Sequence, residues 1–159
     1  MKIKKTILLV TIVMLFTATI FFTTDNASAK QNISHEETEI LKLVNSQRTS
    51  LGIGKLKMDE KLNMIAQIKA QDMADKKYFS HNSPLYGSVF DMMQKYNYSY
   101  RTAGENIAMG QKSAQSVMRS WMRSSGHRDN ILKDEYNRLG VGFAVSKSGQ
   151  PYWVQIFAG

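Results

Sequence analysis

Apolar and polar residues alternate along the chain with two periods, one typical of helices and one typical of strands. Apolar residues recur every three or four positions in four segments, and this spacing predicts amphipathic helices. These segments are residues 34–51, 59–77, 88–96 and 113–124. Near the end, small and apolar residues alternate over 139–145 and 152–157 around a turn at 147–150, which predicts an antiparallel hairpin. Helices followed by a hairpin indicate one α+β domain.

Polar residues in front of the periodic segments predict where helices begin. Ser34 is followed three residues later by Glu37, the arrangement of a capping box. Asp59 and Ser88 stand in the same position before the second and third helices. Residues 78–87 carry serine, asparagine, proline and glycine, and are therefore predicted to form a loop.

The first residues have the pattern of an export signal. Lysines in the first five positions precede an apolar run over residues 7–22, and a small-x-small triplet ends at Ala29. We predict a signal peptide over 1–29, cleaved after Ala29, then a polar lead-in over 30–38 and one domain over 39–158. An uncleaved N-terminal anchor is the alternative, because the apolar run is near the lower limit for spanning a bilayer. Both interpretations place the domain outside the cytoplasm.

The composition adds a positive charge and a lack of cysteine. The segment 1–29 carries three lysines and one aspartate, so its removal lowers the formal net charge from +8 to +6. A basic surface favours contact with anionic wall polymers or lipid head groups, although a solvated basic surface needs no partner. No basic run with interleaved aromatic residues is present, which argues against nucleic acid as a partner. An exported chain without cysteine is typical of a Gram-positive bacterium, and we expect a secreted protein that associates with the cell wall.

Three polar segments at element boundaries have compositions that helix and strand formation do not require. They are residues 79–84, 104–108 and 121–128. They contain His81, Glu105 and His127, a set that suits a divalent metal such as zinc or general acid–base chemistry. Each residue also has a structural interpretation: His81 as a loop residue bonded to backbone, Glu105 as a helix start, and His127 as a residue after a glycine cap.

Four ordered motifs closely resemble the bacterial branch of the CAP superfamily, whose members are also called SCP domains. They are Tyr78-Phe79-Ser80-His81, Gly104-Glu105-Asn106-Ile107-Ala108, Ser120-Trp121-Met122 with Gly126-His127-Arg128-Asp129-Asn130-Ile131-Leu132, and Tyr152-Trp153-Val154-Gln155-Ile156-Phe157. The resemblance covers about Glu39 to Ala158. It implies a three-layer α-β-α sandwich with a small antiparallel sheet and a cleft lined by histidines and acidic residues.

The resemblance also implies roles for individual residues. The family's two histidines and its first glutamate fall on His81, His127 and Glu105, which makes these three the expected metal ligands. Where animal and plant members carry a second glutamate, this chain has Ser124, so the site is reduced to three residues. Asn106 and Gln155 match further polar positions and are expected to line the cleft with Ser124.

Three functions compete at this point. The first is an extracellular binding module that holds a wall polymer, a lipid or another small ligand, with membrane contact only through an uncleaved signal sequence. Arg119, Arg123 and Arg128 form its candidate anion-binding patch. The second is a metal-assisted or acid–base hydrolase of wall or peptide substrates; its catalytic residues are not identified by any hydrolase motif. In the third, the His and Glu cluster fastens three loops of the fold.

Overall fold

The computed structural model describes the backbone of residues 24–159 and the side chains from His35 onward. The predicted signal peptide therefore lies outside the described residues except for its last six positions. The chain divides into two units, Met1–Ser34 and His35–Gly159, and the second contains the features discussed below. Over the described part of the chain, no helix combines the length and the apolar character needed to cross a bilayer.

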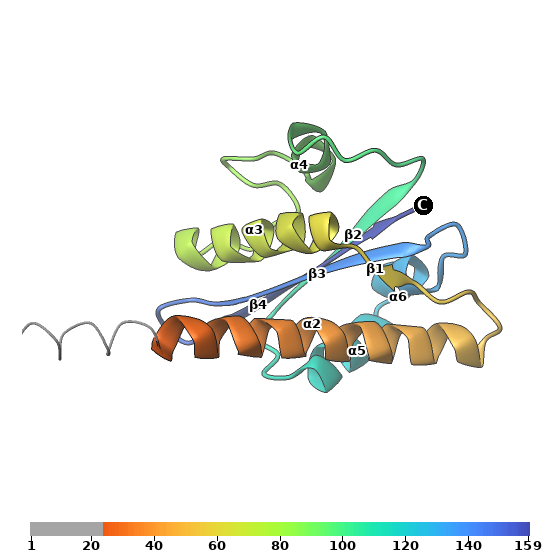
Figure 1. Ribbon diagram of the computed structural model, residues 1–159, viewed down its shortest axis with the longest axis horizontal. Coiled ribbons are helices and arrows are strands. Elements are labelled where there is room, and N and C mark those ends of the chain that lie inside the picture. Colours follow the sequence, from red (N-terminus) through yellow and green to blue (C-terminus); the bar gives the residue numbers. More distant parts are fainter. Residues whose placement is uncertain (1–23) are drawn as a thin grey trace, which may run out of the picture. The chain divides into compact units, whose positions relative to one another are not determined.

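Helices come first in the chain and the longest strands come last (Figure 1). The elements are α2 (Thr24–Ser50), β1 (Lys57–Met58), α3 (Glu60–Lys76), α4 (Val89–Lys95), β2 (Ala103–Met109), α5 (Ala114–Arg123), α6 (Ser125–Leu132), β3 (Arg138–Val145) and β4 (Pro151–Ala158).

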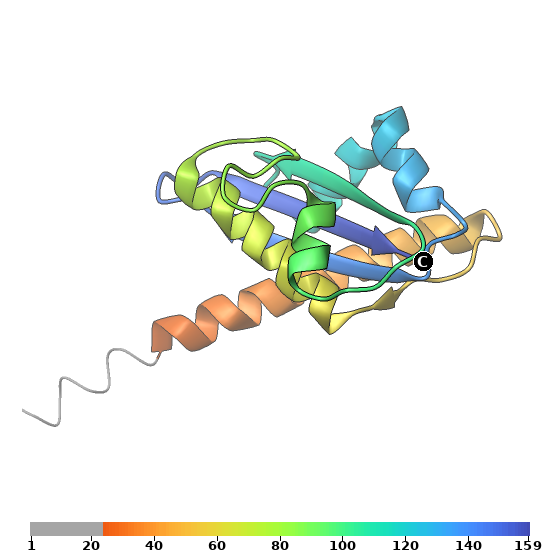
Figure 2. The same cartoon turned by 90° about the horizontal axis from the view of Figure 1, so that it is seen from above.

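A four-stranded sheet in the order β1-β3-β4-β2 forms the middle layer of the domain. Strands β3, β4 and β2 are antiparallel, whereas the two-residue β1 runs parallel to β3. Helices α3 and α4 cover one face, and α2 with α5 covers the other (Figures 1 and 2). The predicted α+β sandwich is confirmed. The sheet is mixed rather than purely antiparallel, because the short strand β1 pairs with β3 in the parallel direction.

Both faces of the central strand β4 are buried, so its residues contribute alternately to two cores. Val154 and Ile156 pack on the side of α3 and α4. Trp153 and Phe157 pack on the side of α2 and α5. This burial on both sides explains why the strand sequence is almost entirely apolar.

Helix α3 packs closely against strand β3 at two glycines. A Cβ atom at Gly142 would collide with the backbone of Ala66, and one at Gly140 would collide with the backbone of Leu62. Strand β1 pairs only with the first two residues of β3, and side chains of α3 cover the edge of β3 after them. The amide of Val141 donates to Asn63 Oδ1 at 2.8 Å, and that of Phe143 donates to Gln67 Oε1 at 2.9 Å. These bonds fix the helix to the strand along its length.

A buried arginine joins the end of α2 to the segment between α6 and β3. Arg48 is 0% exposed and its guanidinium donates to four carbonyl oxygens. The acceptors are Gly54 at 2.6 Å, Ile131 at 2.9 Å, Lys133 at 2.8 Å and Tyr136 at 3.0 Å. Arg48 thereby holds the end of α6, the helix that carries His127.

Three local predictions differ from the structure. The helix start predicted at Ser34 is wrong, because α2 begins at Thr24 and residues 24–34 contain no proline or glycine to stop it. Glu105 does not begin a helix but lies in strand β2. The segment after α5 continues as α6, a helix that the glycine at 126 had masked.

We predict that Gly142→Ala lowers the free energy of unfolding by about 1–3 kcal/mol, the range of overpacked cores. The added methyl group meets helix backbone, which cannot give way as a side chain can. Gly126→Ala is the matched control, because a Cβ atom there meets nothing within 4 Å and alanine favours a helix. Urea unfolding of both variants measures the effect, and equal stability of the two would contradict close packing at Gly142.

Candidate functional site

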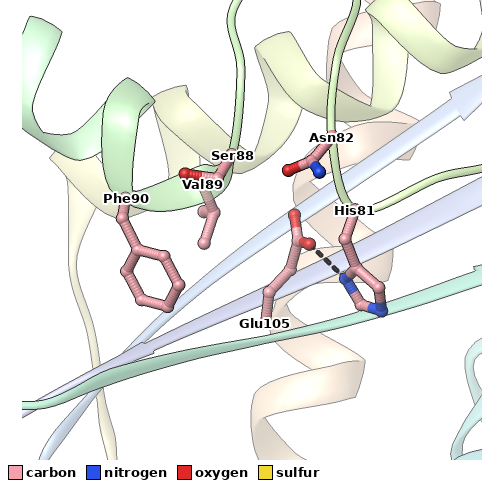
Figure 3. Close-up of a pocket in the computed structure, with 6 residues that line it drawn as sticks. All are labelled: His81, Asn82, Ser88, Val89, Phe90 and Glu105. Atoms are coloured by element: carbon pink, nitrogen blue, oxygen red, sulfur yellow. Dashed lines mark hydrogen bonds and ion pairs between the residues drawn. The ribbon is translucent and has the colours of Figure 1, made fainter.

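His81 and Glu105 form a hydrogen-bonded ion pair at the edge of the sheet (Figure 3). His81 lies in the loop after α3, and Glu105 is the third residue of β2. His81 Nδ1 is 2.6 Å from Glu105 Oε2, with the histidine side chain 61% exposed and the glutamate side chain only 4% exposed. The hydrogen bond to Glu105 raises the pKa of His81 above its ordinary value of 6.5, although burial acts against this shift.

A buried lysine supports this pair from the side of helix α3. Lys69 is 0% exposed, and its ammonium donates to the backbone carbonyl of His81 at 2.8 Å. The ammonium also lies 5.4 Å from the centre of the Tyr78 ring. Burial lowers the pKa of Lys69, while the charges of Glu105 and Asp72 act in the opposite direction. Lys69 therefore places a positive charge beneath the His81 and Glu105 side chains.

Asp72 fastens both ends of the loop to the same helix. Its Oδ2 accepts hydrogen bonds from Tyr78 Oη at 2.5 Å and Ser83 Oγ at 2.6 Å, and its Oδ1 pairs with Lys76 Nζ at 2.6 Å. Burial alone would raise the pKa of Asp72, but the hydrogen bonds from Lys76, Ser83 and Tyr78 outweigh it and the pKa is lowered. The loop that carries His81 is thus held by two neighbouring turns of α3.

A second polar network lies on the opposite face of β2. Asn106 is fully buried, and its Nδ2 donates to the carbonyl oxygen of His127 at 3.0 Å and to Gln155 Oε1 at 3.1 Å. Asn130 Nδ2 in turn donates to Asn106 Oδ1 at 2.9 Å and to the Glu105 carbonyl at 3.1 Å. This network fixes the backbone of α6 at His127. Burial and the neighbouring charge of His81 lower the pKa of His127.

The structure brings His81 and Glu105 into contact, but it does not gather a metal-ligand set. Among the residues it describes, no group of three or more histidine, aspartate, glutamate or cysteine side chains could hold a metal ion. His81 Nδ1 is engaged by Glu105, and the part of His127 that is fixed by Asn106 is its backbone carbonyl. The described residues therefore form no preformed zinc centre. Metal binding by His81, Glu105 and His127 stays a prediction.

A pocket of about 260 Å³ opens beside the His81 and Glu105 pair (Figure 3). Its lining residues are His81, Asn82, Ser88, Val89, Phe90 and Glu105. Asn82, Ser88, Val89 and Phe90 were not among the predicted site residues. In α4 the side chains of Val89, Met92 and Met93 point inward, which leaves Phe90 46% exposed. The predicted cap at Ser88 was the one signal that this helix begins at the site.

The remaining predicted residues are not among those that line this pocket. Asn106 and Gln155 are buried in the second network, and Ser124 connects α5 to α6. Arg119 and Arg123 are exposed one turn apart on α5. Arg128 is partly buried and donates to the Met122 carbonyl at 3.3 Å, so its guanidinium is partly engaged by the protein.

The family model of the cysteine-rich secretory proteins, CAP, matches residues 41–157. The sheet covered by helices on both faces, with His81 and Glu105 at its edge, agrees with this match. The chain therefore belongs to the CAP family.

Two bacterial relatives support the assignment. YkwD of Bacillus subtilis (strain 168) is 46% identical over 137 residues, which cover 86% of this chain and 52% of that protein. The crystal structure of an extracellular SCP-domain protein from Bacillus anthracis has a TM-score of 0.74 at 31% identity, over 81% of this chain and 42% of that one. The chain thus spans about half the length of these relatives.

A third protein shares the fold at a lower sequence identity. A cysteine-rich secretory protein from Staphylococcus aureus has a TM-score of 0.65 at 21% identity, over 79% of this chain and 39% of that one. At this identity the likeness concerns the fold. Taken together, the relatives place the chain in a family that includes extracellular bacterial proteins.

We predict that His81 and His127 give opposite contributions to stability as the pH changes. The raised pKa of His81 means that its contribution is complete below pH 6.5 and is lost as the pH rises through the raised value. The lowered pKa of His127 means that stability is lost as the pH falls from 6.5 through the lowered value. The effect of His81 is on the order of 0.5 kcal/mol because its side chain is largely exposed.

Urea unfolding of His81→Gln and His127→Gln between pH 5 and pH 9 measures these contributions. His81→Gln should differ most from the unsubstituted protein at acid pH, where it removes a stabilising pair. His127→Gln should improve the relative stability at acid pH. The same pH trend in both variants would contradict the raised pKa of His81 and the lowered pKa of His127.

We predict that Asn106→Ala lowers the free energy of unfolding by about 1–3 kcal/mol, because it leaves buried partners without hydrogen bonds. Asn137→Ala changes an exposed asparagine and should stay within about 0.5 kcal/mol of the unsubstituted protein. Amide exchange at Asn130 and its neighbours should accelerate only in the Asn106 variant. Unchanged stability of that variant would show that the second network does not hold α6.

Proposed function

We propose that this chain is an extracellular binding module whose ligand site is the pocket beside His81 and Glu105. The observation that carries the proposal is the composition of that pocket. It joins a charged, hydrogen-bonded pair to an apolar wall formed by Val89 and Phe90. Small-molecule sites combine apolar walls with a few fixed polar groups in this way.

Three features support a location at the cell envelope. Relatives of this family include a protein described as extracellular, and residues 1–29 have the pattern of a signal peptide. The formal charge of the remaining chain, +6, favours contact with anionic envelope polymers. That attraction is long-ranged and unspecific, so recognition is assigned to the pocket and accumulation at the envelope to the charged surface.

The buried carboxylate of Glu105 is the group on which this proposal can be tested. Glu105→Gln keeps the shape of the side chain but removes its charge and the ion pair with His81. We expect this variant to bind isolated cell walls about tenfold more weakly, which corresponds to 1.4 kcal/mol. Binding is measured by co-sedimentation with isolated walls, and in parallel with vesicles of phosphatidylglycerol and phosphatidylcholine.

The measurement is made at low and at high salt, because high salt screens the contribution of the basic surface. Glu60→Gln makes the same chemical change at an exposed position and should bind like the unsubstituted protein. Circular dichroism checks that each variant is folded. Equal binding of the Glu105 and Glu60 variants at high salt would exclude the pocket, and binding to vesicles alone would replace the wall ligand with a lipid.

The same pair supports hydrolysis as a second candidate. Glu105 engages His81 Nδ1 and leaves Nε2, on a side chain that is 61% exposed, free to transfer a proton. A carboxylate that orients an imidazole is a recurring arrangement for a general base. Release of reducing ends or of free amino groups from isolated walls would detect this activity. Equal release by the unsubstituted protein and by His81→Gln would exclude His81 as the base.

A further inference from the structure

The buried carboxylate at the pocket has one oxygen that the protein leaves without a partner. Glu105 Oε2 is bonded to His81, but Oε1 is buried and no group among the described residues donates a hydrogen bond to it. Figure 3 shows this second oxygen turned away from His81, on the side of the Asn82 amide and Ser88. A buried acceptor without a donor is destabilising, so a ligand that supplies an N–H or O–H group is favoured.

An exposed asparagine lines the same pocket as this carboxylate (Figure 3). Asn82 and His81 are both exposed, and no hydrogen bond involves the Asn82 carboxamide within the described part of the chain. A free carboxamide offers two donors and one acceptor to a ligand. Asn82 therefore offers polar groups to a ligand that reaches the carboxylate.

The charges around the pocket favour an uncharged ligand. Glu105 is negative, while the ammonium of Lys69 lies beneath the His81 carbonyl and interacts electrostatically with Glu105. A cationic ligand would meet the positive charge of Lys69. An anionic ligand would meet the free oxygen of Glu105. A neutral ligand with a hydroxyl or amide donor avoids both of these like-charge contacts.

The apolar wall of the pocket is an exposed aromatic ring. Phe90 is 46% exposed and packs in a tilted arrangement on Tyr100, with 6.3 Å between the ring centres. The pocket volume, about 260 Å³, is below the usual range for drug-sized ligands, roughly 300–1,000 Å³. This space suits one ring that is apolar on its face and polar around its edge, and it is too small for a sterol.

Resting on the binding function proposed above, we infer that the pocket takes one uncharged sugar residue of a wall glycan. The face of the sugar ring packs on Phe90, and its hydroxyl or acetamido donor binds Glu105 Oε1. Asn82 binds the neighbouring polar groups of the ring. Phe90 and Asn82 are then the residues that determine specificity, whereas the basic surface contributes only general attraction to the envelope.

The test uses N-acetylglucosamine trimer as the probe and two-dimensional amide NMR of the purified protein as the readout. We expect shifts confined to residues 81–90 and 103–107. Phe90→Ala should weaken the affinity about tenfold, and Asn82→Ala about threefold. Phe79→Ala is the matched control, because Phe79 is similarly exposed at 47% but does not line the pocket, and its affinity should match that of the unsubstituted protein.

The outcomes separate the ligand class from the binding function. If the trimer causes no shifts but inorganic phosphate or a short wall peptide shifts the same amides, the sugar is wrong and the pocket remains the site. If no probe shifts these amides and wall binding does not depend on Glu105, the binding function itself fails. If the Phe90 and Phe79 variants bind the trimer with equal affinity, the proposed packing of the sugar ring on Phe90 is wrong.

Discussion

The direct contact between helix α3 and strand β3 is the constraint on which the site depends. Gly140 and Gly142 remove the side chains that would hold the two backbones apart. The helix therefore lies deep enough for Lys69 and Asp72, farther along it, to be buried under the loop after its end. That loop presents His81, so the packing of a helix on a strand determines where a functional side chain lies.

The edge strand β2 divides the candidate residues between two environments. Because neighbouring strand residues point to opposite faces, Glu105 faces α3 and α4 while Asn106 faces α6. The first receives the imidazole of His81, and the second binds the backbone of His127. The strand thus fixes the side chain of one histidine and the backbone of the other.

Charge also has two separate roles in this molecule. Inside the domain, the charges of Lys69, Glu105 and His81 are close enough to compensate one another, and this compensation allows a carboxylate to be buried beside a pocket. On the outside, residues such as Arg119 and Arg123 stay solvated and act at longer range. The charges inside the domain and those on its surface therefore act at different ranges.

Local sequence patterns were sufficient to predict the α+β class, helices α3, α4 and α5, and the terminal hairpin. They also predicted His81 and Glu105 as site residues, and the structure places these two side chains in contact. These features follow from local periodicity, from caps at Asp59 and Ser88, and from short motifs that stay contiguous in the chain. Only the tertiary structure decided that Arg48 and Lys69 are buried and that Phe90 is exposed, because burial depends on partners distant in sequence. The pocket itself arose in the same way, since a strand, a loop and a helix start must meet before their side chains can enclose a space.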